Sequence, residues 1–220
     1  MYFEYGVQET EYLARKDKRL GAAIEQIGHI DRAVDGDLFS SVVHQIVGQQ
    51  ISTKAQETIW QRMQQALGTV DAAHILAAGV PELQKLGITY RKAEYITDFA
   101  RKVQTGECRI EEIWQMPDEE VIRVLSSLKG IGVWTAEMIL LFCMQRPDVL
   151  SYDDLAIQRG LRMLYHHRKI DRRLFEKYRR RYSPYGSVAS LYLWAIAGGA
   201  IPGMRDYAPA KPVSRKKKTV

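Results

Sequence analysis

The chain has 220 residues, 46% of them hydrophobic, which is enough to bury a sizeable core in one domain or two small lobes without disulfides. Two cysteines, Cys108 and Cys143, are too few for an iron–sulfur cluster or a four-thiolate zinc site, and their separation indicates no disulfide framework. No apolar run reaches the length of a membrane span, and the first residues lack the apolar stretch of a signal peptide. We therefore expect a soluble intracellular protein.

The net charge of +6 and the isoelectric point of about 9.2 suggest a polyanionic partner. Five of the basic residues, however, lie in the last stretch, which has no acid: Lys211, Arg215, Lys216, Lys217 and Lys218. Without these five, the net charge of the rest falls from +6 to +1. We expect residues 208–220 to form a basic, disordered tail, and any contact of the folded body with a polyanion to come from local patches.

Apolar residues recur at three- and four-residue spacing along almost the whole chain, and no stretch alternates with period two. After one helix near the N-terminus, the pattern predicts helices at about 38–47, 55–67, 71–79, 90–104, 118–128, 133–145, 154–165, 171–182 and 187–199. We assign Trp60 and Trp114 to the core. The sequence therefore predicts an all-α fold.

The segment Leu125-Ser-Ser-Leu-Lys-Gly-Ile-Gly-Val-Trp-Thr-Ala136 joins two predicted helices through a tight Gly-x-Gly turn. Gly130 and Gly132 permit positive φ and leave backbone amides uncovered. These amides, with the positive end of the following helix, can bind a phosphate oxygen. Ile131 would plug the turn into the core. The alternative interpretation is an ordinary helix–helix turn.

Two adjacent acids, Asp153 and Asp154, lie where a later helix begins. Aspartate is a favoured N-cap, and we assign capping to Asp153. A fixed carboxylate at Asp154 could instead stabilise the positive charge that builds on a sugar when an N-glycosidic bond breaks, and could orient or deprotonate the attacking water. Spacing alone does not choose between capping and catalysis.

Together the two motifs resemble those of the helix-hairpin-helix DNA glycosylase superfamily. The segment 130–136 is similar to the hairpin of that family, and 154–157 is similar to its catalytic segment. Trp134 lies 20 residues before Asp154, as in the alkylbase branch.

Two further segments carry the same resemblance. Residues 44–52 are similar to the family's Gly-Gln-x-hydrophobic-Ser loop, and residues 187–194 are similar to the C-terminal helix of bacterial 3-methyladenine DNA glycosylase II. The resemblance spans about residues 35–200, and the combination of motifs is more specific than any one of them.

The resemblance implies two helical lobes with the DNA and base cleft between them, and no N-terminal β-domain. Residues 35–146 would form a helical barrel lobe that contains the wedge loop and the hairpin. Residues 1–34 and 147–207 would form the second lobe, which carries the catalytic Asp154.

By the same resemblance, the protein would be a monomeric DNA glycosylase of base-excision repair. It would hydrolyse the N-glycosidic bond of flipped alkylated purines in double-stranded DNA, of the 3-methyladenine and 7-methylguanine type, and leave an abasic site. Strand-cleaving relatives place a Schiff-base lysine at the position of Trp134, so lyase activity is not expected. The expected location is the bacterial cytoplasm, with the nucleoid, or a eukaryotic nucleus.

Two alternatives stay open at this point. The first is a monofunctional glycosylase for another base lesion. The second is a non-catalytic DNA-damage-binding module in which Asp154 is only a cap.

The resemblance also distributes roles among residues. The expected catalytic residue is Asp154, and the expected walls of the base pocket are Trp134, Tyr152 and Trp194. The expected DNA contacts are Gln49, Gln50, Lys129, Gly130, Gly132, Val133 and Thr135.

Some of these positions depart from the pattern of the family. Gln50 is the expected wedge that fills the space of the flipped base, where the related bacterial enzyme has an apolar residue. Tyr152 replaces a proline that often precedes the acid pair, and Gly186 stands where many relatives have an arginine.

No cofactor is expected to be required. In the family, hairpin carbonyls can bind a monovalent cation, Na⁺ or K⁺, and by position these would be the carbonyls of Ser126, Leu128 and Ile131. We expect His166 and His167 to mark an exposed helix end rather than a metal site.

Overall fold

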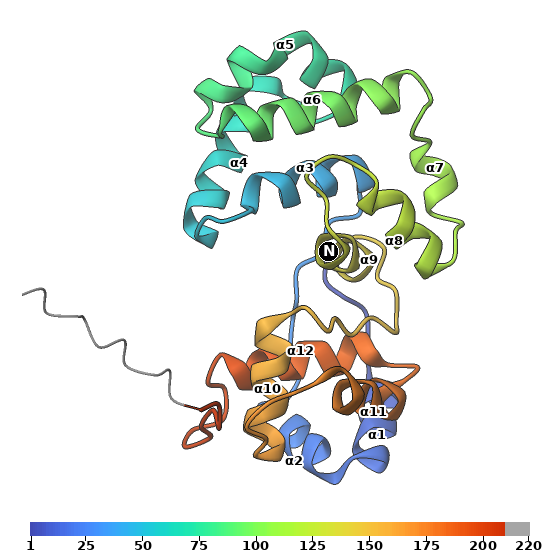
Figure 1. Cartoon of the computed structure of the whole chain (residues 1–220), viewed down its shortest axis with the longest axis vertical. Coiled ribbons are helices and arrows are strands. Elements are labelled where there is room, and N and C mark those ends of the chain that lie inside the picture. Colours follow the sequence, from blue (N-terminus) through green and yellow to red (C-terminus); the bar gives the residue numbers. More distant parts are fainter. Residues whose placement is uncertain (210–220) are drawn as a thin grey trace, which may run out of the picture. The chain divides into compact units, whose positions relative to one another are not determined.

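The computed structural model describes residues 1–209; the tail predicted at 208–220 thus lies, from residue 210 on, outside the described residues. Within residues 1–209 there are twelve α-helices and no strand beyond a single bridge between Tyr2 and Ala33, so the predicted all-α fold is confirmed (Figure 1). The helices are α1 (Val7–Lys16), α2 (Lys18–Ile27), α3 (Leu38–Gly48), α4 (Thr53–Leu67), α5 (Ala72–Lys85), α6 (Tyr90–Gln104), α7 (Ile110–Ile113), α8 (Asp118–Ser126), α9 (Val133–Phe142), α10 (Leu155–Tyr165), α11 (Arg172–Tyr182) and α12 (Gly186–Ala197). None of these helices is long and apolar enough to cross a membrane.

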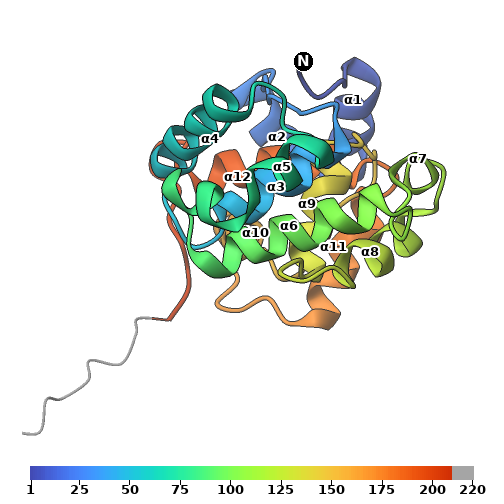
Figure 2. The ribbon, with the colours of Figure 1, turned by 90° about the horizontal axis from the view of Figure 1, so that it is seen from above.

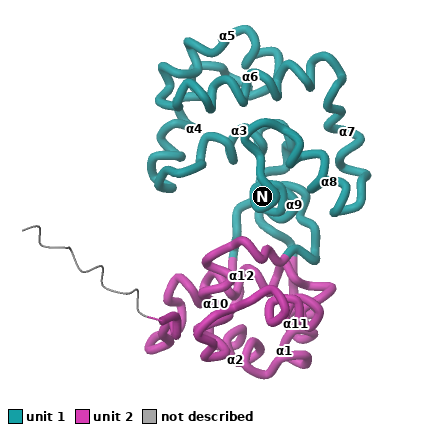
Figure 3. Tube along the Cα trace, viewed as in Figure 1, with its two compact units in different colours: residues 1–4, 31–149 teal, residues 5–30, 150–220 magenta. Residues whose placement is uncertain are grey.

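The chain divides into two compact units (Figure 3). Unit 1 comprises residues 1–4 and 31–149 and contains α3 to α9. Unit 2 comprises residues 5–30 and 150–220, and its described part contains α1, α2, α10, α11 and α12. The hairpin motif therefore belongs to unit 1, and the acid pair belongs to unit 2.

Unit 1 is built around α3, which packs on α4, α6 and α9. Helices α5 and α6 run side by side (Figure 2). The rings of Phe39 in α3 and Phe99 in α6 stack with their centroids 4.9 Å apart. Helix α9 is buried on nearly every side after its first two residues, which matches its almost continuous apolar sequence.

Unit 2 is centred on the pair α10 and α12. The two helices approach closely at Gly160, where an added Cβ would lie 2.3 Å from the carbonyl oxygen of Leu193. Helix α12 is buried along most of its length, and α11 contributes three buried aromatic side chains, Phe175, Tyr178 and Tyr182. This packing fixes the start of α10, where the acid pair lies.

Helix starts in the sequence are marked by side-chain caps. In seven helices an Asp, Ser or Thr oxygen accepts from an amide of the first turn: Asp17 for α2, Asp37 for α3, Ser52 for α4, Asp71 for α5, Thr89 for α6, Asp154 for α10 and Asp171 for α11. Helix α9, which follows the hairpin, has no side-chain cap.

The structure corrects three predicted elements. The single N-terminal helix is two helices, because Asp17 has an extended backbone and its side chain caps α2. The helix predicted at 71–79 continues to Lys85 across non-helical Gly79, because Pro81 suits the first turn of the resumed helix. The one-turn helix α7 was not predicted, since four residues are too few to show an apolar period.

The assignment of Trp60 and Trp114 to the core is wrong, because both side chains are partly exposed. Trp60 lies on α4, where Met63 is the one buried residue. Too little of this helix is covered by the rest of the protein to bury a side chain as large as tryptophan.

Candidate functional site

The hairpin between α8 and α9 turns at Gly130, where φ is +84°. A Cβ at this position would lie 2.3 Å from Cδ2 of Tyr95, so both the backbone angle and the Tyr95 ring require glycine. Leu128 and Ile131 on either side are buried, and the Ile131 amide donates to the Leu128 carbonyl at 3.1 Å. The prediction that Ile131 plugs the turn into the core is confirmed.

The first turn of α9 offers backbone amides for an anion. Its N-cap residue, Gly132, lends no side chain, and the first amides of a helix have no partner within the helix. Val133 and Trp134 are 49% and 40% exposed, whereas Thr135 is buried. Lys129, also exposed, has its ammonium 3.8 Å from Asp98. A helix start without a side-chain cap, the positive helix end and a nearby lysine together suit a phosphate oxygen.

The loop between α3 and α4 is tied to the hairpin and to α6. The Gln49 side-chain amide donates to the Gly130 carbonyl at 2.7 Å. The Lys92 ammonium donates to the carbonyls of Val47 at 2.8 Å and Gln49 at 2.6 Å, and burial lowers the pKa of Lys92. Gln50 follows with φ of +58° and an exposed side chain. These bonds present Gln50 at the tip of a braced loop.

Asp154 is the N-cap of α10 and is 7% exposed. Its Oδ1 accepts from the amides of Ala156 at 2.8 Å and Ile157 at 2.9 Å. The assignment of the cap to Asp153 is therefore wrong: Asp153 is exposed, and the residue that directly precedes the helix is Asp154. Two amide donors hold the carboxylate at a fixed position at the positive end of the helix.

The three predicted pocket aromatics lie on separate elements. Trp134 starts α9 in unit 1, and Trp194 lies partly exposed on α12 in unit 2. Tyr152, two residues before the acid, packs on α11: the centroid of its ring lies 5.2 Å from that of Phe175, and the Arg172 guanidinium lies 4.8 Å from the ring centre. Tyr152 and Asp154 thus share one segment of unit 2.

The sequence missed three residues that shape these elements. Lys92 braces the loop between α3 and α4, Tyr95 fills the space beside Gly130, and Arg172 lies over Tyr152. No local pattern marks them, because each acts on a residue that is far away in the chain.

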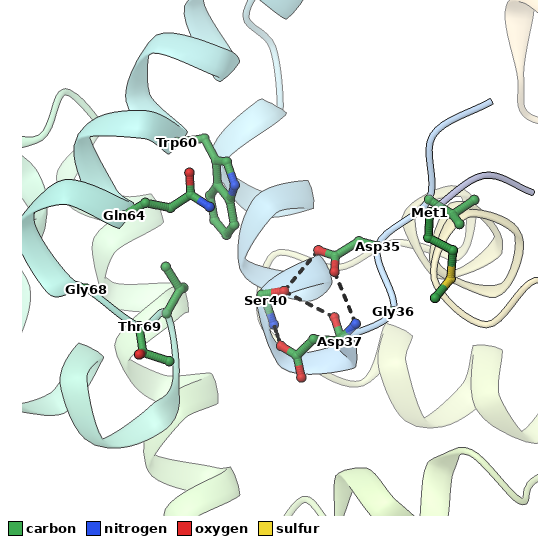
Figure 4. Close-up of a pocket in the computed structure, with 11 residues that line it drawn as sticks. Met1, Asp35, Gly36, Asp37, Ser40, Trp60, Gln64, Gly68 and Thr69 are labelled. Atoms are coloured by element: carbon green, nitrogen blue, oxygen red, sulfur yellow. Dashed lines mark hydrogen bonds between the residues drawn. The ribbon is translucent and has the colours of Figure 1, made fainter. Parts of the chain in front are cut away.

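Unit 1 also contains a hollow of about 600 Å³ that none of the predicted site residues lines (Figure 4). Asp35 and Asp37 line it from one side, and Trp60 and Gln64 of α4 line it from another. Oδ2 of Asp35 accepts from the Ser40 hydroxyl at 2.9 Å, and Oδ2 of Asp37 accepts from the Ser40 amide at 2.7 Å. The two carboxylates would repel a polyanion, so this hollow does not suit DNA.

Residues 1–209 contain no group of three or more His, Cys, Asp or Glu side chains that could hold a metal ion. The predicted cation ligands are backbone carbonyls, those of Ser126, Leu128 and Ile131. The Leu128 carbonyl accepts one hydrogen bond, from the Ile131 amide, and a carbonyl oxygen has a second lone pair. The residues are therefore compatible with a weakly bound monovalent cation.

Comparison with known proteins relates most of the chain to one family. Residues 43–184 match the sequence model of the family described as "HhH-GPD superfamily base excision DNA repair protein". This range contains the loop after α3, the hairpin and the segment with Asp154.

Two curated proteins are similar over most of this chain. The protein named DNA-3-methyladenine glycosylase 1 of Schizosaccharomyces pombe is 29% identical over 184 residues, which cover 81% of this chain and 78% of that protein. YfjP of Bacillus subtilis is 26% identical over 187 residues, which cover 80% of this chain. The match spans only 64% of the length of YfjP.

Two solved structures are also similar. A crystal structure titled as a DNA-3-methyladenine glycosidase from Bacillus halodurans has a TM-score of 0.79 and 34% identity, covering 90% of this chain and 93% of that one. The Schizosaccharomyces pombe 3-methyladenine DNA glycosylase Mag1, solved with abasic DNA, has a TM-score of 0.76 and 25% identity, covering 86% of this chain and 96% of that one.

Proposed function

The chain belongs to the HhH-GPD superfamily of base excision DNA repair proteins, and from this membership we propose that it is a monofunctional DNA glycosylase for alkylated purines. It would release bases of the 3-methyladenine and 7-methylguanine type from double-stranded DNA by hydrolysis and leave an abasic site. The names of its relatives support this substrate class. The observation that carries the proposal is the buried carboxylate of Asp154, which two amides hold at the start of α10.

The proposed chemistry needs one ionised carboxylate. Breaking the N-glycosidic bond builds positive charge on the deoxyribose, and a negative charge fixed beside it stabilises that state. The same carboxylate can orient the attacking water and accept its proton. Methylation at N3 or N7 already leaves the purine positively charged, so the base departs without a separate protein acid.

Trp134 supports both the substrate class and the absence of strand cleavage. It lies at the position where strand-cleaving relatives carry a Schiff-base lysine, and an indole cannot form that adduct. The residue is 40% exposed, and we propose that an electron-poor methylated purine stacks on its indole. We propose Tyr152 and Trp194 as further walls of the base pocket.

We propose that unit 1 grips the DNA. The backbone amides of Gly130, Gly132, Val133 and Thr135 would face a phosphate, with Lys129 beside them. Gln49 would hold the wedge loop, and Gln50 at its tip would fill the space that the flipped base leaves. A monovalent cation on the carbonyls of Ser126, Leu128 and Ile131 would supply positive charge next to the same phosphate.

The test is an assay of base release from duplex DNA treated with a methylating agent. We expect wild-type protein to release methylated purines and to leave the strand intact until alkali is added, and we expect borohydride to trap no protein–DNA adduct. Parallel duplexes with uracil or hypoxanthine show whether another lesion is preferred. Strand cleavage without alkali, together with a trapped adduct, would contradict the monofunctional assignment.

A second candidate is a non-catalytic damage-binding module, which the capping role of Asp154 specifically favours, because a cap needs no chemistry. Such a module would bind methylated duplexes and release no base from any of the substrates above.

A further inference from the structure

Charge is distributed unevenly between the two units. Unit 1 holds 12 Lys and Arg against 17 Asp and Glu, a net charge of −5. The described part of unit 2, residues 5–30 and 150–209, holds 15 against 9, a net charge of +6. The unit that carries the hairpin is therefore acidic overall, and the net positive charge of the described body lies in unit 2.

Most of the excess in unit 2 lies on and beside α11. Residues 159–181 contain ten Lys and Arg but only two acids, Asp171 and Glu176. Helix α11 turns its aromatic face, with Phe175, Tyr178 and Tyr182, into the core of unit 2. Its other faces are polar, and they carry the positive charge.

Three of the cations on α11 form one exposed stripe: Arg173, Lys177 and Arg180. Their spacing of four and then three residues places them on the same face of the helix. No ion pair of these three occurs among the described residues, because the one acid of the helix, Glu176, is paired with Arg172 at 3.0 Å and Arg179 at 3.2 Å. Like charges at this spacing repel one another, so the stripe costs stability unless an anion covers it.

The stripe begins beside the segment that carries Asp154. The ring of Tyr152 touches α11 at Arg172 and Phe175, next to the first cation of the stripe. From Arg173 to Arg180 the helix rises about 10 Å, at about 1.5 Å per residue. That length corresponds to about three nucleotide steps of about 3.4 Å along one strand.

We propose that the stripe Arg173–Lys177–Arg180 is a phosphate-binding surface for the duplex whose base reaches Asp154. The inference rests on the proposed function for the identity of the partner. The guanidinium groups and the ammonium contact phosphates of one strand within this length, without reading the base sequence. Unit 2 in this way adds long-range electrostatic attraction to the local phosphate contacts of unit 1, whose net charge is negative.

The test compares wild-type protein with the triple variant Arg173→Gln, Lys177→Gln, Arg180→Gln. Anisotropy of a labelled, undamaged duplex gives Kd over a range of KCl concentrations. We expect Kd at about 0.1 M salt to rise at least about tenfold, and the slope of log Kd against log salt to fall by about 2 to 3, since each phosphate contact contributes about 0.9. Because the three side chains are exposed and unpaired, we expect the melting temperature to stay within about 3 °C.

A charge-matched control separates a specific surface from net charge. The variant Arg15→Gln, Lys16→Gln, Lys18→Gln removes three exposed cations from α1 and α2 of the same unit, and we expect it to bind as wild type does. Both triple variants retain residues 210–220. Wild-type affinity and salt slope in the α11 variant would overturn the inference, and the partner of the stripe would then be an acidic protein. An equal loss of DNA affinity in both variants would overturn it as well.

Failure of the proposed phosphate-binding surface can be distinguished from failure of the proposed base-release reaction. At saturating enzyme, base release by the α11 variant should proceed at the wild-type rate. If wild type releases no methylated base while the α11 variant alone loses DNA affinity, the proposed reaction fails and the surface stands.

Discussion

The carboxylate of Asp154 is fixed by the helix that it caps. Two short hydrogen bonds from the backbone hold Oδ1, so the position of the charge depends on the start of α10. The sequence predicted a cap at this helix start but chose the wrong acid of the pair. Asp153 and Asp154 are equally good caps, and only the backbone decides which of them precedes the first helical residue.

The two hairpin glycines, Gly130 and Gly132, differ in backbone angle and in the space around them, so alanine variants at the two positions form a matched pair. Gly130→Ala introduces a Cβ 2.3 Å from the Tyr95 ring at φ of +84°, whereas Gly132 has φ of −98° and nothing within 4 Å of its added Cβ. We expect Gly130→Ala to lower the free energy of unfolding by about 2 kcal/mol or more and Gly132→Ala to change it by less than about 1 kcal/mol. Chemical denaturation measures both. Equal stability of the two variants would contradict the packing described for the hairpin.

At the scale of elements, the long amphipathic helices were predictable because one apolar face repeats over several turns. The break between α1 and α2 was not, because it lies in a charged run with no proline or glycine. It depends on Asp17, which accepts from the amides of Arg19 and Leu20 and from the Arg181 guanidinium of α11. That ion pair joins residues far apart in the chain, and no local pattern predicts it.

The Asp17–Arg181 pair makes the stability of the fold depend on pH. Burial opposes ionisation of Asp17, but the hydrogen bonds from Arg181 and Leu20 outweigh it and lower the pKa of this carboxyl below its usual 3.8. A carboxyl whose pKa is lower in the folded state than in the unfolded state stabilises the fold at pH values above the unfolded-state pKa. This contribution is lost as the pH falls through the folded-state pKa. We expect Asp17→Asn to be less stable by about 3 kcal/mol at pH 7.

Guanidinium titrations between pH 3 and pH 7 check this expectation. The difference in free energy of unfolding between wild type and Asp17→Asn should be constant above about pH 5 and shrink below about pH 4. A difference that grows on acidification would contradict the assigned role of Asp17.

For the whole molecule, the sequence indicated a nearly neutral body, but it did not show that positive and negative charge lie in different units. The net charge of +1 before the tail is the sum of an acidic unit and a basic unit, and the units interleave along the chain, so only the structure separates them. The same holds for the bond between Gln49 and Gly130, which lie 81 residues apart. Motif spacing identified the segments to which we assign the proposed function, while the contacts that hold them together required the fold.

The most direct test of the central claim is the single-turnover rate of methylated-purine release by Asp154→Asn. Asparagine keeps an Oδ1 acceptor that can cap α10 and replaces the charged Oδ2 by a neutral amide group, so we expect the variant to fold and to bind DNA. We predict a fall in rate of at least about 10²-fold. Release at the wild-type rate by a folded, DNA-binding Asp154→Asn protein would contradict the assignment of Asp154 as the catalytic carboxylate.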